Sequence, residues 1–282
     1  MTTRTVTEKQ RAAAGSSSRS WWSALLRSPW RDIAQFILLI GVLGWLISLS
    51  TSRLGYNWQW YRVPRFIVRR EGGRLVAGPL IEGLLFTFRI AGLSLVLSLI
   101  LGLTTAIIRL SDSWMGRILT RVYLEVIRNT PLVVQVYLVY FVIGPILGLE
   151  RFTSAVIALS LFEGAYMSEI FRSGIVSLPT GQWEAAYSLG LSPFDTYRDV
   201  ILPQAIRRVL PPLTSEVISL IKNTSLVSLV SLSDLALQAR VIAADTFLTF
   251  EIWFTTALIY LALTVPLSLA EHYLEKRFKV LT

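Results

Sequence analysis

Long apolar runs separated by short polar segments dominate the pattern along this chain. Each run is apolar over about the ~20 residues that an α-helix needs to cross the hydrocarbon core of a bilayer. Segments of strictly alternating hydrophobicity, which would indicate a membrane β-barrel, do not occur. The pattern therefore predicts an all-α, polytopic membrane helix bundle with about six transmembrane helices, at residues 33–50, 84–108, 122–148, 153–171, 209–231 and 252–270.

The composition supports a membrane protein. The chain has 282 residues, 53% of them hydrophobic and 16% charged, and its mean hydropathy is +0.57. This leaves too little polar surface for a soluble domain. A net charge of +9 could indicate nucleic-acid binding in a soluble protein, but here the basic residues gather just outside the apolar runs, as membrane orientation requires. We expect contact with membrane lipid and no nucleic-acid partner.

The flanking charges predict the orientation of the chain. Arginine and lysine are enriched on the cytoplasmic side of membrane proteins, and they lie here before the first run and after the last. Both termini are therefore expected in the cytoplasm, which agrees with an even number of spans. Two internal loops fall on the same side, and they are marked by Arg109, Arg117 and Arg121 and by Arg198, Arg207 and Arg208.

The segment at 51–83 departs from this rule, because it carries six arginines although the count of spans places it outside. Its aromatic residues favour a segment anchored at the membrane interface: Tyr56, Trp58, Trp60 and Tyr61. The expected organisation is a cytoplasmic tail (1–32), an extra N-terminal transmembrane helix with an external or interfacial loop (33–83), a core domain (84–275) with a cytoplasmic loop at 178–203, and a cytoplasmic tail (276–282).

Residues for catalytic or cofactor chemistry are scarce. The chain has no cysteine, one histidine at position 272 and no carboxylate cluster with the spacing of metal ligands. It also lacks the GxxxxGK[ST] loop that binds nucleotide phosphates. We therefore expect no enzyme activity, no metal site and no bound cofactor on this chain.

The loop at 178–203 contains dense signals for short helices. Residues 182–189 have helical composition, and Gly190 can end that helix in a left-handed conformation. Ser192 can cap a second helix, with Pro193 at its first position and Asp195 three residues after the cap. We expect Pro203 to stop this second helix. An interfacial helix pair anchored by Trp183 and Tyr187 would also explain the pattern.

Several residues of this loop carry a resemblance to a known family. Glu184, Ala185 and Ala186, then Gly190, and finally Leu202 and Pro203 resemble the EAA loop of permeases in binding-protein-dependent ABC importers. The sequence departs from the family at Val200, where isoleucine is usual. The segments at 128–141, 163–175 and 221–235 resemble the polar amino-acid branch, of the histidine- and glutamine-permease type.

The resemblance, which covers about residues 80–275, implies a function and a set of partners. The chain would be the inner-membrane subunit of an ATP-driven importer for polar amino acids, either glutamate, glutamine, aspartate and asparagine or basic amino acids. Its partners would be a cytoplasmic ATP-binding subunit, a second permease subunit of the same or a homologous kind, and a periplasmic amino-acid-binding protein. ATP and Mg²⁺ would bind to the partner ATPase.

A short helix that projects from such a bundle can transmit movement from a soluble subunit to the spans. We expect it to seat in a groove of the ATPase, so that closure of the ATPase moves the attached helices. Ala185 and Ala186 would permit a close approach, Gly190 the turn, and Glu184 a polar anchor.

Charged residues within or near the predicted spans are candidates for a substrate path, because an isolated charge at the bilayer centre costs at least ~2.5 kcal/mol. Glu163 lies near the expected midplane, with Tyr166 on the same helical face. A polar cluster at 222–225 could interrupt the next helix and expose backbone groups to a cavity. The candidate path comprises Arg128, Glu163, Tyr166, Lys222, Asn223 and Thr224. Glu163 would meet the ammonium group of the substrate, and Lys222, or the backbone amides around Asn223 and Thr224, would meet its carboxylate. Helix–helix hydrogen bonding, ion pairing and snorkelling are the alternatives.

Two other classes of function remain open. An autonomous ion-coupled transporter would also tolerate charges within the membrane, and it would transport under an ion gradient without ATP. A membrane-embedded enzyme would need a catalytic constellation, which the sequence does not offer.

Overall fold

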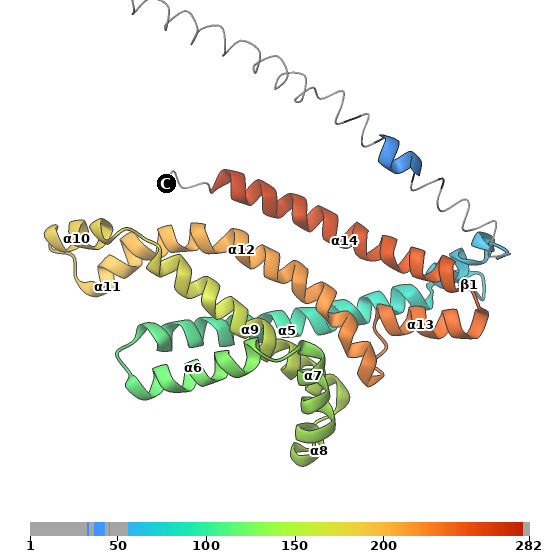
Figure 1. Cartoon of the computed structure of the whole chain (residues 1–282), viewed down its shortest axis with the longest axis horizontal. Helices are drawn as coiled ribbons and strands as arrows, with labels where there is room; N and C mark the ends of the chain where they lie inside the picture. The colour runs from blue at the N-terminus through green and yellow to red at the C-terminus, as the bar shows by residue number, and fades with distance from the viewer. Residues whose placement is uncertain (1–32, 34–36, 43–44, 46–55, 279–282) are drawn as a thin grey trace, which may run out of the picture. The chain divides into compact units, whose positions relative to one another are not determined.

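The computed structural model of the chain describes residues 33, 37–42, 45 and 56–278 (Figure 1). Two compact units are present, Met1–Trp58 and Gln59–Thr282. In the first unit residues 37–42 are helical. The rest of the predicted span at 33–50, together with the tail at 1–32, lies outside the described residues, apart from positions 33 and 45. All the features considered below belong to the second unit.

Three helices of the described part are long and apolar enough to cross a membrane, namely α5 (Pro79–Leu110), α9 (Arg151–Val176) and α14 (Thr249–Arg277). They contain the predicted spans at 84–108, 153–171 and 252–270, so these three predictions are confirmed. Helix α5 begins earlier than predicted, since Pro79 occupies its first turn, where a missing N–H leaves no hydrogen bond unmade.

The span predicted at 122–148 is wrong as a continuous helix. Helix α6 (Trp114–Arg128) ends before Pro131, and the chain resumes as α7 (Leu132–Tyr137), a π-helical segment (Leu138–Ile143) and α8 (Gly144–Leu147). The axis bends by 107° at this break. The proline ring disfavours helical conformation at the residue before it, Thr130, and this explains the break.

The span predicted at 209–231 is part of a longer, broken run. After α10 (Thr180–Ser188), the chain forms α11 (Pro193–Asp195), a π-helical segment (Thr196–Ile201) and α12 (Leu202–Asn223). A 3₁₀ segment (Thr224–Val230) then leads to α13 (Leu235–Thr246) across a bend of 51°. The predicted interruption at 222–225 is thus confirmed as a change from α to 3₁₀ geometry at Thr224. Counting each bent pair as one span gives up to five spans in the described residues.

The expectation that Pro203 stops a helix is wrong. Pro203 lies in the first turn of α12, which continues directly from the π-helical segment. A π-helix pairs each N–H with the carbonyl five residues earlier, whereas an α-helix uses the carbonyl four residues earlier. Pro203 has no N–H, and it lies close to the point where the chain changes from the first pattern to the second.

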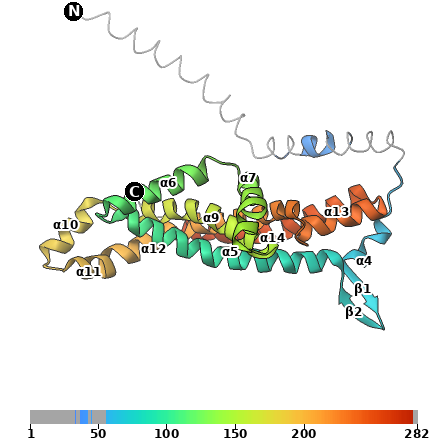
Figure 2. The same cartoon turned by 90° about the horizontal axis from the view of Figure 1, so that it is seen from below.

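A β-hairpin precedes α5 within the segment expected to be a loop (Figure 2). A 3₁₀ turn (Trp60–Arg62) and α4 (Pro64–Ile67) lead into antiparallel strands β1 (Val68–Glu71) and β2 (Arg74–Ala77), with Glu71 opposite Arg74. Gly72 and Gly73 form the two-residue turn, with φ of +56° and +78°. A Gly-Gly pair between alternating residues is a hairpin signal, so this element was readable from the sequence.

Helices α5 and α9 pack along their length through small residues. A Cβ added at Gly102 would lie 2.9 Å from Cβ of Met167, and one at Gly164 would lie 3.1 Å from Cβ of Leu101. The hydroxyl of Ser160 also donates to the carbonyl oxygen of Ser94, at 3.4 Å. Small residues allow such close backbone approach in membrane bundles. This contact fixes α9, which carries Glu163 and Tyr166.

Candidate functional site

The loop between α9 and α12 forms a compact corner at one end of the bundle (Figure 1). Gly190 has φ of +77°, and its N–H donates to the carbonyl oxygen of Tyr187 at 2.9 Å, which confirms the predicted left-handed end of α10. Ser192 caps α11 as predicted, because its hydroxyl oxygen accepts from the N–H of Asp195 at 3.2 Å. Its hydroxyl also donates to the Asp195 carboxylate, at 2.5 Å.

The corner has its own small apolar core. Leu178, Ile201 and Ala205 are buried there, and Trp183 packs against them. The Trp183 ring also meets the ring of Tyr197 edge-on, with centroids 4.8 Å apart. Trp183 is therefore a packing residue of the loop, which removes one of the anchors that the interfacial-helix alternative requires.

The residues of the EAA pattern divide between this core and the exposed surface. Ala186 is buried, whereas Glu184, Ala185 and Gly190 are exposed. Leu202 and Pro203 are also exposed, at the start of α12. Beside them lie large exposed apolar side chains, Leu189 (82% exposed) and Phe194 (70%). The tip of the loop thus presents apolar and acidic groups, and Ala186 serves its packing.

Glu163 is fully buried between α9 and α12. Its Oε1 accepts a hydrogen bond from Nδ2 of Asn223 at 2.9 Å. Its Oε2 has no hydrogen-bond partner among the described residues. The carboxyl of Glu216, on α12, lies close enough to interact with it. The structure therefore brings together two of the predicted path residues, Glu163 and Asn223.

Lys222 does not join this pair. Its side chain is exposed, and among the described residues it forms no ion pair. Thr224 is buried, and its hydroxyl donates to the carbonyl oxygen of Ile221 at 2.7 Å, within its own helix. Lys222 therefore does not lie beside Glu163, and Asn223 takes that place.

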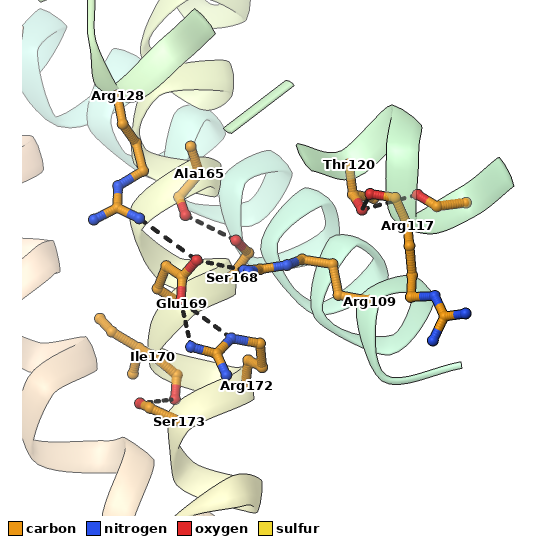
Figure 3. Close-up of polar contacts among 11 residues, drawn as sticks. Arg109, Arg117, Thr120, Arg128, Ala165, Ser168, Glu169, Ile170, Arg172 and Ser173 are labelled. Carbon is orange, nitrogen blue, oxygen red and sulfur yellow. Dashed lines mark hydrogen bonds and ion pairs between the residues drawn. The ribbon is translucent and has the colours of Figure 1, made fainter. Parts of the chain in front are cut away.

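Glu169 stands at the centre of an arginine cluster drawn from three helices (Figure 3). Arg172 donates to its Oε2 from Nε at 3.2 Å and from Nη2 at 2.9 Å, and Arg109 of α5 bonds its Oε1. Nη1 of Arg128, at the end of α6, lies 3.5 Å from the same Oε1. The Arg128 guanidinium also lies over the ring of Tyr166, 5.6 Å from its centroid.

A pocket of about 400 Å³ opens beside this cluster, lined by Arg109, Arg121, Leu124, Glu125, Arg128, Asn129, Tyr166 and Glu169. Arg128 and Tyr166 of the predicted path thus share one pocket, apart from the buried Glu163. Arg109 and Arg121 were expected in a loop, and Glu169 was not predicted as a residue of the path. The only local signal was the spacing of Glu169 and Arg172, three residues apart on one helix.

Comparison with known proteins identifies relatives of this chain. Residues 95–280 match the family described as binding-protein-dependent transport system inner membrane component. The glutamine transport system permease protein of Escherichia coli (strain K12) is 40% identical over 205 residues, which cover 72% of this chain and 94% of that protein. The L-cystine transport system permease protein of Bacillus subtilis (strain 168) is 42% identical over 219 residues, 76% of this chain and 91% of that protein.

Solved structures agree with the sequence relatives. A crystal structure of an amino acid ABC transporter with histidines has a chain that is 36% identical, with a TM-score of 0.66, covering 71% of this chain and 94% of that one. The methionine ABC transporter in an inward-facing conformation has a TM-score of 0.58 at 15% identity, over 71% of this chain and 96% of that one. The second likeness concerns the fold alone.

Proposed function

The chain belongs to the family of binding-protein-dependent transport system inner membrane components, and from this premise we propose that it is the transmembrane subunit of an ATP-driven importer of polar amino acids. The observation that carries the proposal is the 40% identity to a glutamine transport permease over 94% of that protein's length. The related transporter with histidines adds support for an amino acid as the substrate.

In this proposal the α10–α11 corner couples the chain to a separate ATPase. Its left-handed turn at Gly190 and its internal core around Trp183 make it stiff, and its tip exposes Glu184, Leu189 and Phe194. A stiff apolar tip can bury surface in a groove of a partner, and α12 carries the movement into the bundle. ATP and Mg²⁺ bind to that partner, and this chain holds no cofactor.

The remaining partners and the topology follow from the same proposal. A second permease subunit, identical or homologous, completes the membrane domain, and a periplasmic amino-acid-binding protein delivers the substrate at the end opposite α10. The α10 end then faces the cytoplasm, as do both termini, and the segment at 51–83 lies outside or in the interface. The flanking charges support this orientation.

The substrate path passes between α9 and its neighbours. Glu163 and Asn223 offer a buried carboxyl and a carboxamide, and Arg128 with Tyr166 offers a cation above an aromatic ring. Burial of polar groups inside a membrane bundle costs free energy, and residues that carry them typically line transport pathways. Thr224 contributes through the helix interruption that it begins, and Lys222 contributes at most from the exposed face of α12.

The proposal is tested by purification of the chain with the ATPase encoded for the same system. The wild-type chain should retain the ATPase through a detergent column, and Glu184→Lys should lose it while inserting normally, because the exposed anchor changes sign. Arg198→Glu is a control for charge change on the loop, at an exposed residue outside the EAA pattern. Equal retention by wild type and Glu184→Lys would remove the coupling role from this residue.

A further inference from the structure

The pocket beside Glu169 carries more positive charge than its own carboxylates neutralise. Three arginines and two glutamates line it, and Arg172 adds a fourth cation behind Glu169. Glu125 is engaged by the side chain of Asn129, at 3.0 Å. None of the ion pairs among the described residues involves Arg121. The pocket therefore offers cationic donors that the protein does not satisfy.

Arg128 is the least firmly held member of the cluster. It lies 3.5 Å from Glu169, farther than Arg172 at 2.9 Å, and its side chain is 44% exposed. Glu169 keeps two guanidinium partners, Arg109 and Arg172, without it. Breaking an ion pair usually costs free energy because it leaves a charge without a partner. Movement of Arg128 toward a ligand avoids this cost, since Glu169 remains paired.

We propose that this pocket binds the carboxylate of the transported amino acid through Arg121 and Arg128, and that its excess positive charge selects anionic and zwitterionic amino acids over cationic ones. This inference rests on the proposed function and narrows its substrate class. A guanidinium donates two parallel hydrogen bonds to a carboxylate, so either arginine suits the ligand geometrically. The volume of about 400 Å³ lies within the range of small-molecule sites.

The chemistry of the lining favours an amino acid over a bare anion. Leu124 and the ring of Tyr166 give the pocket an apolar side, against which the stem of glutamate or glutamine can pack. Glutamate brings two carboxylates, one for each of Arg121 and Arg128, and glutamine brings one. In lysine the charges of the α-ammonium and α-carboxylate groups cancel, and the remaining side-chain ammonium would be repelled by the excess positive charge of the arginines.

A different result is expected if the ion cluster only holds the helices together. Such a cluster would need Arg109, Glu169 and Arg172, which join α5 to α9, and it would have no use for Arg121. Replacement of Arg121 therefore distinguishes ligand binding from the ion pairing that holds α5 against α9. Arg117 serves as the matched control, because it is an exposed arginine of the same helix whose side chain lies apart from Glu169 (Figure 3).

The test measures binding to the purified complex of permease and ATPase without the periplasmic protein, so that the permease alone selects. Equilibrium dialysis with radiolabelled L-glutamate, L-glutamine and L-lysine should give the tightest binding for glutamate and the weakest for lysine. Arg121→Gln and Arg128→Gln should each weaken glutamate binding about tenfold or more, the loss typical of a charged hydrogen bond. Arg117→Gln should bind all three as wild type does.

The proposal is overturned if lysine binds as tightly as glutamate, or if Arg121→Gln binds glutamate as wild type does. A second arm repeats the dialysis in nanodiscs of phosphatidylcholine with and without phosphatidylglycerol. Dependence of the arginine effects on the anionic lipid would assign the pocket to lipid phosphates and overturn the proposal. Arg121-dependent glutamate binding by a chain that transports without ATP would refute the importer and leave the pocket standing.

Discussion

Replacement of Gly190 isolates the backbone geometry on which coupling depends. The residue has φ of +77°, and a Cβ built there would meet no heavy atom within 4 Å. A substitution therefore causes no clash, and its cost is confined to the left-handed conformation. That cost is ~1–2 kcal/mol for an ordinary L-residue, more for a β-branched one and less for asparagine.

This strain lowers the fraction of molecules whose loop has the conformation that binds the ATPase. Because 1.4 kcal/mol is a factor of ten, Gly190→Ala lowers the ratio of native to reshaped corners about tenfold, and the fraction of molecules with the native corner falls by up to that factor. The apparent dissociation constant for the ATPase rises by the inverse of that fraction. We expect affinity to fall in the order Gly, Asn, Ala, Val at this position, with uptake following it.

The assay is titration of the purified permease variants with the ATPase, together with ATP-driven uptake. Gly148→Ala is the control, because Gly148 also has a positive φ, +67°, and a Cβ added there would meet no heavy atom within 4 Å, but it lies at the end of α8. It should cost similar stability without weakening the ATPase complex. Equal ATPase affinity for Asn, Ala and Val at position 190 would refute the reasoning.

Three further outcomes are expected. Glu163→Gln should lose uptake but keep the thermal stability of the wild type, since a carboxamide can still accept a hydrogen bond from Asn223. Glu163→Leu should lose uptake and also lower the unfolding free energy by ~1–3 kcal/mol, because the Asn223 amide is left unpaired. Full uptake by Glu163→Gln would exclude this carboxyl from the path. Gly102→Val should separate α5 from α9 and cost ~1–3 kcal/mol by thermal unfolding, because even a Cβ there lies 2.9 Å from a neighbour; an unchanged melting temperature would contradict this packing. Single cysteines at positions 10, 188 and 280 should resist an impermeant thiol reagent in intact cells, and one at 74 should react; labelling of position 10 would refute the predicted orientation.

Local signals in the sequence were sufficient for the corner that carries α10. A glycine after a helical run and a serine before proline each act within a few residues, and both kept the predicted conformation at Gly190 and Ser192. Hydropathy likewise located α5, α9 and α14, because their length and apolar composition leave few alternatives. The same averaging over a window concealed the break at Pro131, where a single residue overrides an apolar run.

Contacts between distant segments could not be predicted from spacing. Arg109 and Glu169 are 60 residues apart, and only the close packing of α5 on α9 brings them together. For the same reason Glu163 was expected beside Lys222 and instead bonds Asn223: one step along a helix turns a side chain by about 100°, so adjacent residues face different neighbours. The arginine pocket therefore became visible only once three helices were placed.

ATP dependence of uptake in proteoliposomes tests the central claim most directly. The chain, its second permease subunit and the ATPase would be reconstituted together, and labelled glutamine supplied on the outside with the periplasmic binding protein. The importer proposal predicts accumulation only when ATP is enclosed and the ATPase is present, and none with an imposed proton or sodium gradient. Accumulation by the permease alone under such a gradient, without ATP, would contradict it.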